Sequence, residues 1–365
     1  MFTRRDILVG SASALVAGSI DASAPISAQD GPKQTRVRVI DVHAHWYPPE
    51  WLALMEKEGD ANGAKMSRNA RGLLVATIPG LSVVFQPQYT DIKTRLASMD
   101  KAGVAMHALS LTQPMAFWAP PAFGLKLCQT YNDACDALHA QYPDRFVGLA
   151  MVPVQDPALA VQEIDRVAKL KGIRGLYMAT HINGKNLDQK EFWPVYARAQ
   201  EASLPILLHP VNPVGAERMR EYHLRNFIGN PTESALAAAS FIFSGAFDDF
   251  PNLVVVLPHS GGVFPQLIGR WDHGASVRPE TKHLKNPPSH YLRRFYYDTV
   301  AHSVPILMNL VRQVGADRVV CGTDFPADMS VEDVVGTVEK LTELPTKDRD
   351  LILRGNAARL LKLDA

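Results

Sequence analysis

The feature that most constrains the fold of this sequence is a regular alternation of short apolar runs with amphipathic stretches. Eight runs have the composition of strands: 36–45, 105–111, 146–154, 173–180, 205–210, 253–260, 295–300 and 318–325. They are rich in β-branched and other apolar residues, which is typical of strands buried on both faces. The stretches between them, such as 157–172 and 303–318, repeat apolar residues at intervals of three and four, as amphipathic helices do.

Eight strand–helix units over about 290 residues predict an α/β protein built as a (β/α)8 TIM barrel. A doubly wound open sheet is the competing layout, but no phosphate-binding Gly-rich turn follows the first strand.

The segment between the first two strands is too long for one crossover helix. Within it, LLVATIPGLSVVFQ (73–86) predicts two strands about a Pro-Gly turn. We therefore expect a small β insertion at about 46–90, above the barrel mouth, and a first barrel helix at 91–103.

The first 28 residues have the pattern of a twin-arginine export signal. Arg4 and Arg5 precede the apolar stretch ILVGSASALVAGSI, and small residues follow. Cleavage is expected after Ala28 rather than Ala24, because Pro25 would otherwise follow the cut directly. The stretch is too short to span a bilayer. The prediction is a periplasmic or otherwise exported protein with a single domain at 29–365; the alternative is an incidental N-terminus and a cytoplasmic protein.

Composition excludes several other classes of protein. The 365 residues are 47% hydrophobic and carry a net charge of +1, which gives no electrostatic signature of nucleic-acid or anionic-membrane binding. Of three cysteines, Cys128 and Cys135 are seven apart in a helical pattern, too far for a disulfide. No CxxC pair is present, so we expect the cysteines to be small buried hydrophobes.

Polar residues gather where the predicted strands end. They are His43 and His45 after the first strand, His181 after the fourth, His209 after the fifth, His259 after the sixth, Asp298 and His302 after the seventh, and Asp324 after the eighth. In a TIM barrel the C-terminal strand ends carry the chemistry. This distribution therefore predicts one site at the barrel mouth.

The residue types at this mouth suit a divalent metal. His43 and His45 are two apart on one strand, so their rings point to the same side. Imidazole nitrogens suit Zn²⁺, and His209 with Asp324 would complete its shell. A bound metal lowers the pKa of water towards about 7, and His259 beside that water would act as general acid or base. Taken singly, each residue also has an ordinary structural interpretation. The roles of His181, Asp298 and His302 stay open between supporting the ligands and lining the rim.

Several longer motifs make the chain resemble the amidohydrolase superfamily, in the amidohydrolase-2 branch typified by aminocarboxymuconate-semialdehyde decarboxylase. They include DVHAHWYPPEW, LLHPVN, FDDFPNLVVVLPHSGGVFP and RVVCGTDFP. The resemblance implies a TIM barrel that binds one Zn²⁺ through His43, His45, His209 and Asp324. It also implies that His259 is the catalytic histidine that activates the metal-bound water. In place of the bridging lysine of binuclear relatives stands His181, which favours a single metal.

The resemblance also implies a homodimer in which an arginine of the neighbouring subunit reaches the substrate carboxylate. Arg278 matches that position and Arg270 is a second candidate; guanidinium suits the role because it pairs with a carboxylate through two parallel bonds. The alternative for Arg278 is a surface salt bridge. Two departures concern substrate contacts: Val211 replaces an aromatic residue, and FQPQY (85–89) lacks the arginine expected near it.

These features predict a metal-dependent, non-oxidative decarboxylase of an unsaturated or aromatic carboxylic acid, with His259 and Asp324 at the reacting centre and a specificity of its own. The alternative is a hydrolase of a lactone, ester or amide on the same site, in which Asp324 or His259 moves the proton. A non-catalytic exported metal-binding protein is disfavoured, because a structural zinc site needs no neighbouring base. The expected partner is a small molecule, with no nucleic acid and no membrane after signal cleavage. The same ligands admit Mn²⁺, Fe²⁺ or Co²⁺.

Overall fold

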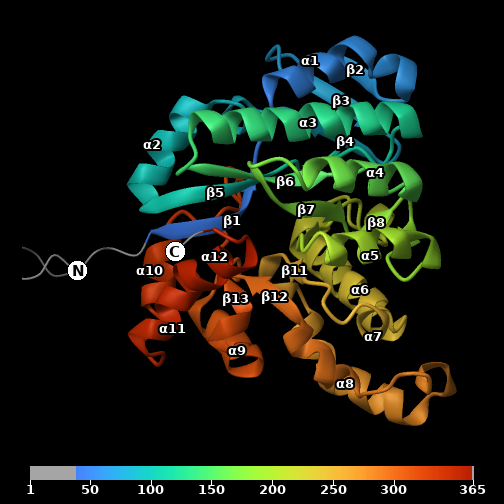
Figure 1. The fold of residues 1–365 in the computed structure, drawn as a ribbon, viewed down its shortest axis with the longest axis vertical. Coiled ribbons are helices and arrows are strands. Elements are labelled where there is room, and N and C mark those ends of the chain that lie inside the picture. Colours follow the sequence, from blue (N-terminus) through green and yellow to red (C-terminus); the bar gives the residue numbers. More distant parts are fainter. Residues whose placement is uncertain (1–37, 364–365) are drawn as a thin grey trace, which may run out of the picture. The chain divides into compact units, whose positions relative to one another are not determined.

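A barrel of eight parallel strands lies at the centre of the computed structural model, which describes residues 38–363 (Figure 1). The export signal predicted at 1–28 lies outside these residues, so it stays a prediction, as does the single domain at 29–365. In sheet order the strands are β1 Val39–His45, β5 Val104–Ser110, β6 Phe146–Met151, β7 Ile173–Ala179, β10 Ile206–His209, β11 Val255–Leu257, β12 Phe295–Asp298 and β13 Val319–Val320. Each overlaps one predicted strand, and the predicted (β/α)8 barrel is confirmed.

Backbone hydrogen bonds join the last strand region to the first. Val42 N donates to the carbonyl of Cys321 at 2.9 Å, and Asp324 N donates to the carbonyl of His43 at 2.8 Å. Beyond β13, His45 N donates to the carbonyl of Phe325 at 2.7 Å. This seam therefore brings the end of the eighth strand region directly against the two histidines of the first.

Helices follow the strands, and several begin with proline in the first turn, where the missing N–H costs no helical bond. The predicted first barrel helix is confirmed: Asp91 caps its start by accepting from the amides of Lys93 and Thr94, and Gly103 ends it at a φ of +70°. The helices are α1 Pro49–Glu58, α2 Ile92–Ala102, α3 Pro121–Gln141, α4 Pro157–Val167, α5 Trp193–Glu201, α6 Asn230–Phe243, α7 Ala246–Asp249, α8 Phe264–Val277, α9 Val304–Val314, α10 Val334–Glu339, α11 Thr346–Asp350 and α12 Asn356–Leu360.

The segment between β1 and β5 contains the predicted β insertion. Strands β3 Leu74–Ile78 and β4 Leu81–Val84 pair antiparallel about the Pro-Gly turn, as expected. A third strand, β2 Lys65–Arg68, and helix α1, which packs against α3, were not predicted. Trp51 of α1 is fully buried and its ring packs with those of Tyr47 and Phe85, which fixes the insertion to the end of β1. A short hairpin, β8 His181–Ile182 with β9 Lys185–Asn186, follows β7.

The three cysteines are unpaired and buried, as the sequence predicts. Within residues 38–363, no helix combines the length and the hydropathy that crossing a membrane requires.

Candidate metal centre and active site

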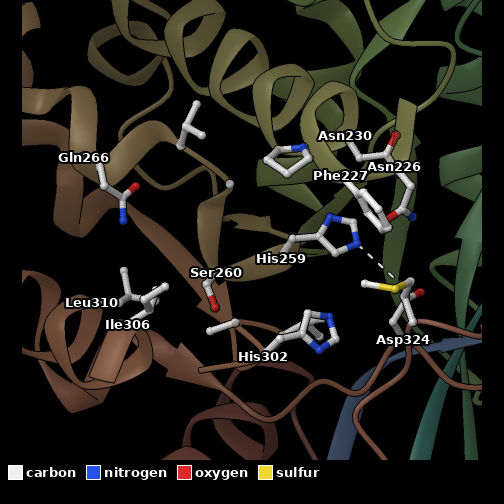
Figure 2. A pocket seen from close by; sticks show the side chains of 16 residues that line it. Asn226, Phe227, Asn230, His259, Ser260, Gln266, His302, Ile306, Leu310 and Asp324 are labelled. Atoms are coloured by element: carbon white, nitrogen blue, oxygen red, sulfur yellow. Dashed lines mark ion pairs between the residues drawn. The ribbon is translucent and has the colours of Figure 1, made fainter. Parts of the chain in front are cut away.

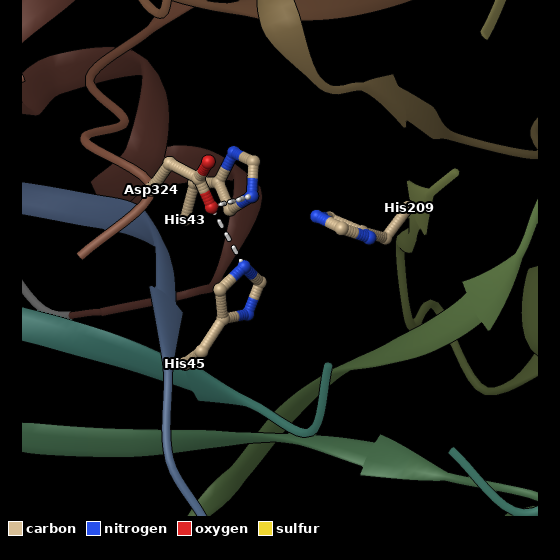
Figure 3. Close-up of side chains that lie close together, drawn as sticks. All are labelled: His43, His45, His209 and Asp324. Carbon is tan, nitrogen blue, oxygen red and sulfur yellow. Dashed lines mark hydrogen bonds and ion pairs between the residues drawn. The ribbon is translucent and has the colours of Figure 1, made fainter. Parts of the chain in front are cut away.

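Four side chains meet at the C-terminal mouth of the barrel (Figure 3). One ligating atom from each of His43, His45, His209 and Asp324 lies within 4.8 Å of all the others, and all four residues are buried. They come from the end of β1, the end of β10 and the loop after β13. The structure thus brings together the four residues that the sequence analysis proposes as metal ligands.

A buried carboxylate, Asp41, fixes the two chain segments that carry three of these side chains. It accepts hydrogen bonds from the amides of His43 (2.9 Å) and Thr323 (3.1 Å) and from the Thr323 hydroxyl (2.5 Å). Asp324 itself has a φ of +65°, a left-handed conformation that is unfavourable for a residue with a Cβ. These bonds therefore hold Asp324 in a strained conformation that directs its carboxylate at the histidines.

Each histidine ring is oriented by a partner on its outer nitrogen. His43 Nδ1 contacts Asp298 Oδ2 at 2.7 Å, His45 Nδ1 contacts Ser110 Oγ at 2.9 Å, and His209 Nδ1 lies 3.0 Å from the carbonyl of Pro210. In metal sites such partners set the tautomer and direct the other nitrogen towards the metal. The contact with His43 settles the alternatives left open for Asp298, which supports a proposed ligand rather than lining the rim.

The donor set fits a divalent cation. His45 Nε2 lies 2.8 Å and His43 Nε2 3.3 Å from Asp324 Oδ1, so two nitrogens and a carboxylate oxygen converge on one small volume. His43 Nε2 is buried and has no hydrogen-bond partner among the described residues. Leaving such an atom without a partner is costly, and a cation would satisfy it.

Electrostatics also mark this cluster as a place for positive charge. Burial lowers the pKa of His45 to about 4 and holds that of His209 well below its usual range, so both rings are neutral and able to ligate at pH 7. Burial opposes charge on His43 as well, but Asp324 and Asp298 outweigh it and raise its pKa to about 10. Burial likewise opposes the charged form of Asp324, yet His43 and the other histidines hold its pKa well below normal. The carboxylates thus stabilise one positive charge at the cluster. A bound metal ion and a proton on His43 would compete to supply that charge.

His259 is not one of the four cluster residues, but Figure 2 shows its ring facing Asp324. Its Nε2 lies 3.8 Å from Asp324 Oδ2, and its ring centre is 5.3 Å from that of His43. The backbone here is strained, with φ of +53° at His259. The HSGG motif explains part of this turn: at Gly262, with a φ of +59°, an added Cβ would lie 2.1 Å from the carbonyl oxygen of Pro231. This backbone conformation places the ring beside Asp324.

A cavity of about 530 Å³ opens at His259 and Asp324. Apolar side chains such as Phe227, Ile306 and Leu310 form much of its wall, and polar groups are added by His302 and by the side-chain amides of Asn226, Asn230 and Gln266. This combination of an apolar wall and few polar groups is typical of a pocket for a small organic ligand.

The remaining predicted substrate contacts lie elsewhere in the single chain. His181 and Val211 line a second cavity of about 720 Å³, together with Phe117, Trp118 and the β3–β4 turn. His181 Nε2 lies 3.0 Å from the carbonyl of Val211, to which it can donate. Arg270 and Arg278 are exposed, on α8 and just after it, and line neither of these two cavities.

Sequence reasoning missed the groups that support the ligands. Asp41 belongs to the first histidine motif but received no role, although a carboxylate two residues before His43 was a visible signal. Arg95 of α2 is buried, and its guanidinium donates to the carbonyl of His45 and lies 4.9 Å over the Phe325 ring. Burial lowers the pKa of Arg95 to about 10. An arginine on an amphipathic helix is usually exposed, so no pattern in the sequence identifies this one.

Comparison with known proteins agrees with this site. The family named Amidohydrolase matches residues 40–363. The chain belongs to this family. The motif-based expectation of the superfamily is therefore confirmed.

Relatives of this amidohydrolase include decarboxylases of known sequence and structure. It is 32% identical over 330 residues to 2-amino-3-carboxymuconate-6-semialdehyde decarboxylase of Dictyostelium discoideum, covering 89% of this chain and 92% of that protein. The structure of 5-carboxyvanillate decarboxylase from Sphingomonas paucimobilis superposes with a TM-score of 0.78 at 28% identity. The match covers 90% of this chain and 100% of that one. Dihydroxybenzoic acid decarboxylase from Polaromonas sp. JS666 was solved with manganese and the inhibitor 2-nitroresorcinol. It superposes with a TM-score of 0.73 at 27% identity, and the match covers 90% of this chain and 97% of that one.

Proposed function

We propose that this amidohydrolase is a metal-dependent, non-oxidative decarboxylase of an aromatic or otherwise unsaturated carboxylic acid. The observation that carries the proposal is the buried cluster of three histidines and Asp324, with His259 beside it and one cavity opening at both. The three relatives described above, which share 27–32% identity with the chain, are all named as decarboxylases of such acids.

The reaction replaces a carboxylate on an unsaturated carbon by a proton. A bound divalent cation supplies positive charge that polarises substrate oxygens and stabilises the negative charge that develops. His259, which lines the cavity, delivers a proton to the carbon that carries the carboxylate. The C–C bond then breaks, its electron pair returns to the conjugated system, and CO₂ leaves. The apolar side chains of the cavity wall, such as Phe227 and Ile306, would contact the substrate ring beside His259.

For the metal we propose Zn²⁺, because three imidazoles and one carboxylate form a ligand set that zinc favours. The Polaromonas relative was solved with manganese, so Mn²⁺ is the first competitor, followed by Fe²⁺ and Co²⁺. The test is to remove the metal, add each ion singly and compare turnover at equal metal content.

The reaction itself is tested with a substrate panel. Metal-loaded protein is incubated with hydroxybenzoates, other unsaturated acids, lactones, esters and amides, and both CO₂ and hydrolysis products are measured. We expect CO₂ from at least one acid and no cleavage of the lactones, esters or amides. Hydrolysis without CO₂ would instead establish the alternative hydrolase.

We further propose a homodimer in which Arg278 or Arg270 of one subunit reaches the substrate carboxylate of the other. The support is the exposure of α8: of its residues only Phe264 and Pro265 are buried, and Val277 is 58% exposed. A second copy that covered this helix would remove apolar surface from water.

Replacing Arg278 by alanine is expected to raise KM by about 10–100-fold without changing metal content, because a charge-assisted pair contributes about 1.5–3 kcal/mol. Arg312→Ala is the control, since Arg312 is an exposed arginine that pairs with Glu343 on the outer surface. Steady-state kinetics of the two variants give the comparison. Unchanged KM in both Arg278→Ala and Arg270→Ala would remove the cross-subunit role.

We also propose export to the periplasm through the twin-arginine segment at 1–28. The support is the sequence pattern of Arg4 and Arg5 ahead of an apolar stretch. Full-length protein that stays in the cytoplasm uncleaved would contradict it.

A further inference from the structure

We propose that Asp298 is a positioning residue that couples the metal ligand His43 to the loop that carries His259. The inference rests on the proposed function, because it concerns how the same site is assembled. Asp298 ends β12, is 1% exposed and lies between these two elements.

Both carboxylate oxygens of Asp298 are engaged, and each serves a different element. Oδ2 lies 2.7 Å from His43 Nδ1. Oδ1 accepts from the amide of Ser260 at 2.8 Å and from that of Val300 at 3.0 Å. The backbone carbonyl of Asp298 also accepts from the Ser260 hydroxyl at 3.1 Å. One side chain therefore contacts a proposed ligand and the residue that follows the proposed catalytic histidine.

The contact with His43 determines which of its nitrogens can ligate. An ionised carboxylate has no hydrogen to give, so the hydrogen between the two residues belongs to His43 Nδ1. Nε2 is then the nitrogen left to bind the cation, and it is the buried atom without a hydrogen-bond partner.

The contacts with Ser260 determine where His259 points. His259 and Ser260 have φ of +53° and +55°, and two successive left-handed residues other than glycine make this backbone strained. Such a conformation persists only when neighbouring groups hold it. The two hydrogen bonds to Asp298 hold Ser260 directly, so they resist relaxation of the loop that would swing His259 away from Asp324.

Space around Asp298 is closed on the side of the eighth strand. A Cβ added to Gly322 would lie 2.8 Å from the Cβ of Asp298 and 3.0 Å from that of His43. The glycine of the GTDFP motif thus allows the segment after β13 to approach both residues, and Asp298 has little freedom to move away from His43.

The change Asp298→Asn separates positioning from simple packing. Asparagine has the same shape, and its Oδ1 can still accept from Ser260 and Val300. Its Nδ2 then faces His43 Nδ1 and requires an acceptor there, which moves the ring hydrogen to Nε2 and blocks ligation. The flipped amide is worse, because its Nδ2 would face two N–H donors.

The test measures metal affinity by competition with a chelator, together with the absorption spectrum of the Co²⁺-loaded protein. We expect Asp298→Asn to lose about 10–100-fold in affinity and to change the Co²⁺ spectrum. Glu163→Gln is the matched control. Glu163, in α4, is also a buried carboxylate, and it accepts hydrogen bonds from Asn132 and Arg166. It does not contact His43 or Ser260 in these bonds, so its change should leave the metal affinity and the Co²⁺ spectrum unaltered.

Wild-type affinity and an unaltered spectrum in Asp298→Asn would overturn the role towards His43, even if the variant were less stable to heat. For the loop, Asp298→Ala also removes the side-chain oxygen that accepts from the Ser260 amide and leaves only the bond from the Ser260 hydroxyl to the backbone carbonyl. Saturated with metal, it should have a lower kcat than Asp298→Asn, and equal kcat values would overturn the coupling. The metal affinity and the Co²⁺ spectrum are measured without any substrate turnover. A lack of CO₂ from every acid would therefore count against the proposed function and not against the role of Asp298.

Discussion

Replacing His259 by alanine is expected to lower kcat by about 10²–10⁴-fold while one metal ion per chain stays bound. The structure explains why this variant should lose activity and keep its metal. His259 contributes no atom to the four-residue cluster, yet its Nε2 lies 3.8 Å from Asp324 Oδ2, and both residues line the cavity. Removing the ring thus removes the proton donor and leaves the ligands in place. Metal content by elemental analysis and kcat from CO₂ release test both parts.

The matched control is His290→Ala. His290 is exposed and lies ahead of β12, at the opposite end of the strand from the site, so this variant should keep wild-type kcat. If His259→Ala lost its metal, His259 would be a ligand and the assignment of the proton transfer would be wrong. If it kept both metal and kcat, the proton would come from another group.

Replacing His43 by alanine is expected to remove both the metal and the activity. His43 sits at the centre of the cluster: Nδ1 contacts Asp298 and Nε2 lies 3.3 Å from Asp324 Oδ1. Without the ring a bound cation loses one of four ligands, and its affinity should fall by more than the roughly 10–100-fold typical of supporting residues. Chelator competition and CO₂ release at a fixed metal concentration provide the measurement.

Folding must be separated from metal loss in this variant, because two buried carboxylates lose a partner. Circular dichroism of His43→Ala should show the same helix and strand content as the metal-free wild type. His139→Ala is a suitable control, since His139 lies in α3 and its ring makes a hydrogen bond to the carbonyl of Phe146, not to a residue of the cluster. A folded His43→Ala protein that bound metal at wild-type affinity would contradict the proposed centre.

The barrel and the meeting of the four residues could be predicted because both follow from periodicity. Strands buried on both faces give continuous apolar runs, and parallel strands place all their C-terminal ends at one mouth. His43 and His45 are separated by two positions and therefore share a face, and His209 and Asp324 end the fifth and eighth strand regions. The fold and the positions of these residues at strand ends are therefore enough to predict that the four side chains lie together.

The supporting groups could not be predicted, because their roles depend on contacts between distant segments. Asp41 bonds to Thr323, Ser110 to His45 and Asp298 to Ser260, and none of these pairs has a fixed spacing in the chain. Helix α1 could not be predicted for a different reason: its apolar residues form one consecutive run at 51–55, which shows no helical period.

The central claim is a decarboxylase with a single metal centre. Its most direct test is to measure CO₂ release from the best acid of the panel while a divalent metal is titrated into metal-free protein. We expect CO₂ release to rise linearly and to stop rising at one equivalent of metal per chain, with the decarboxylated compound formed in equal amount. Saturation at two equivalents, or CO₂ release at full rate by the metal-free protein, would contradict it.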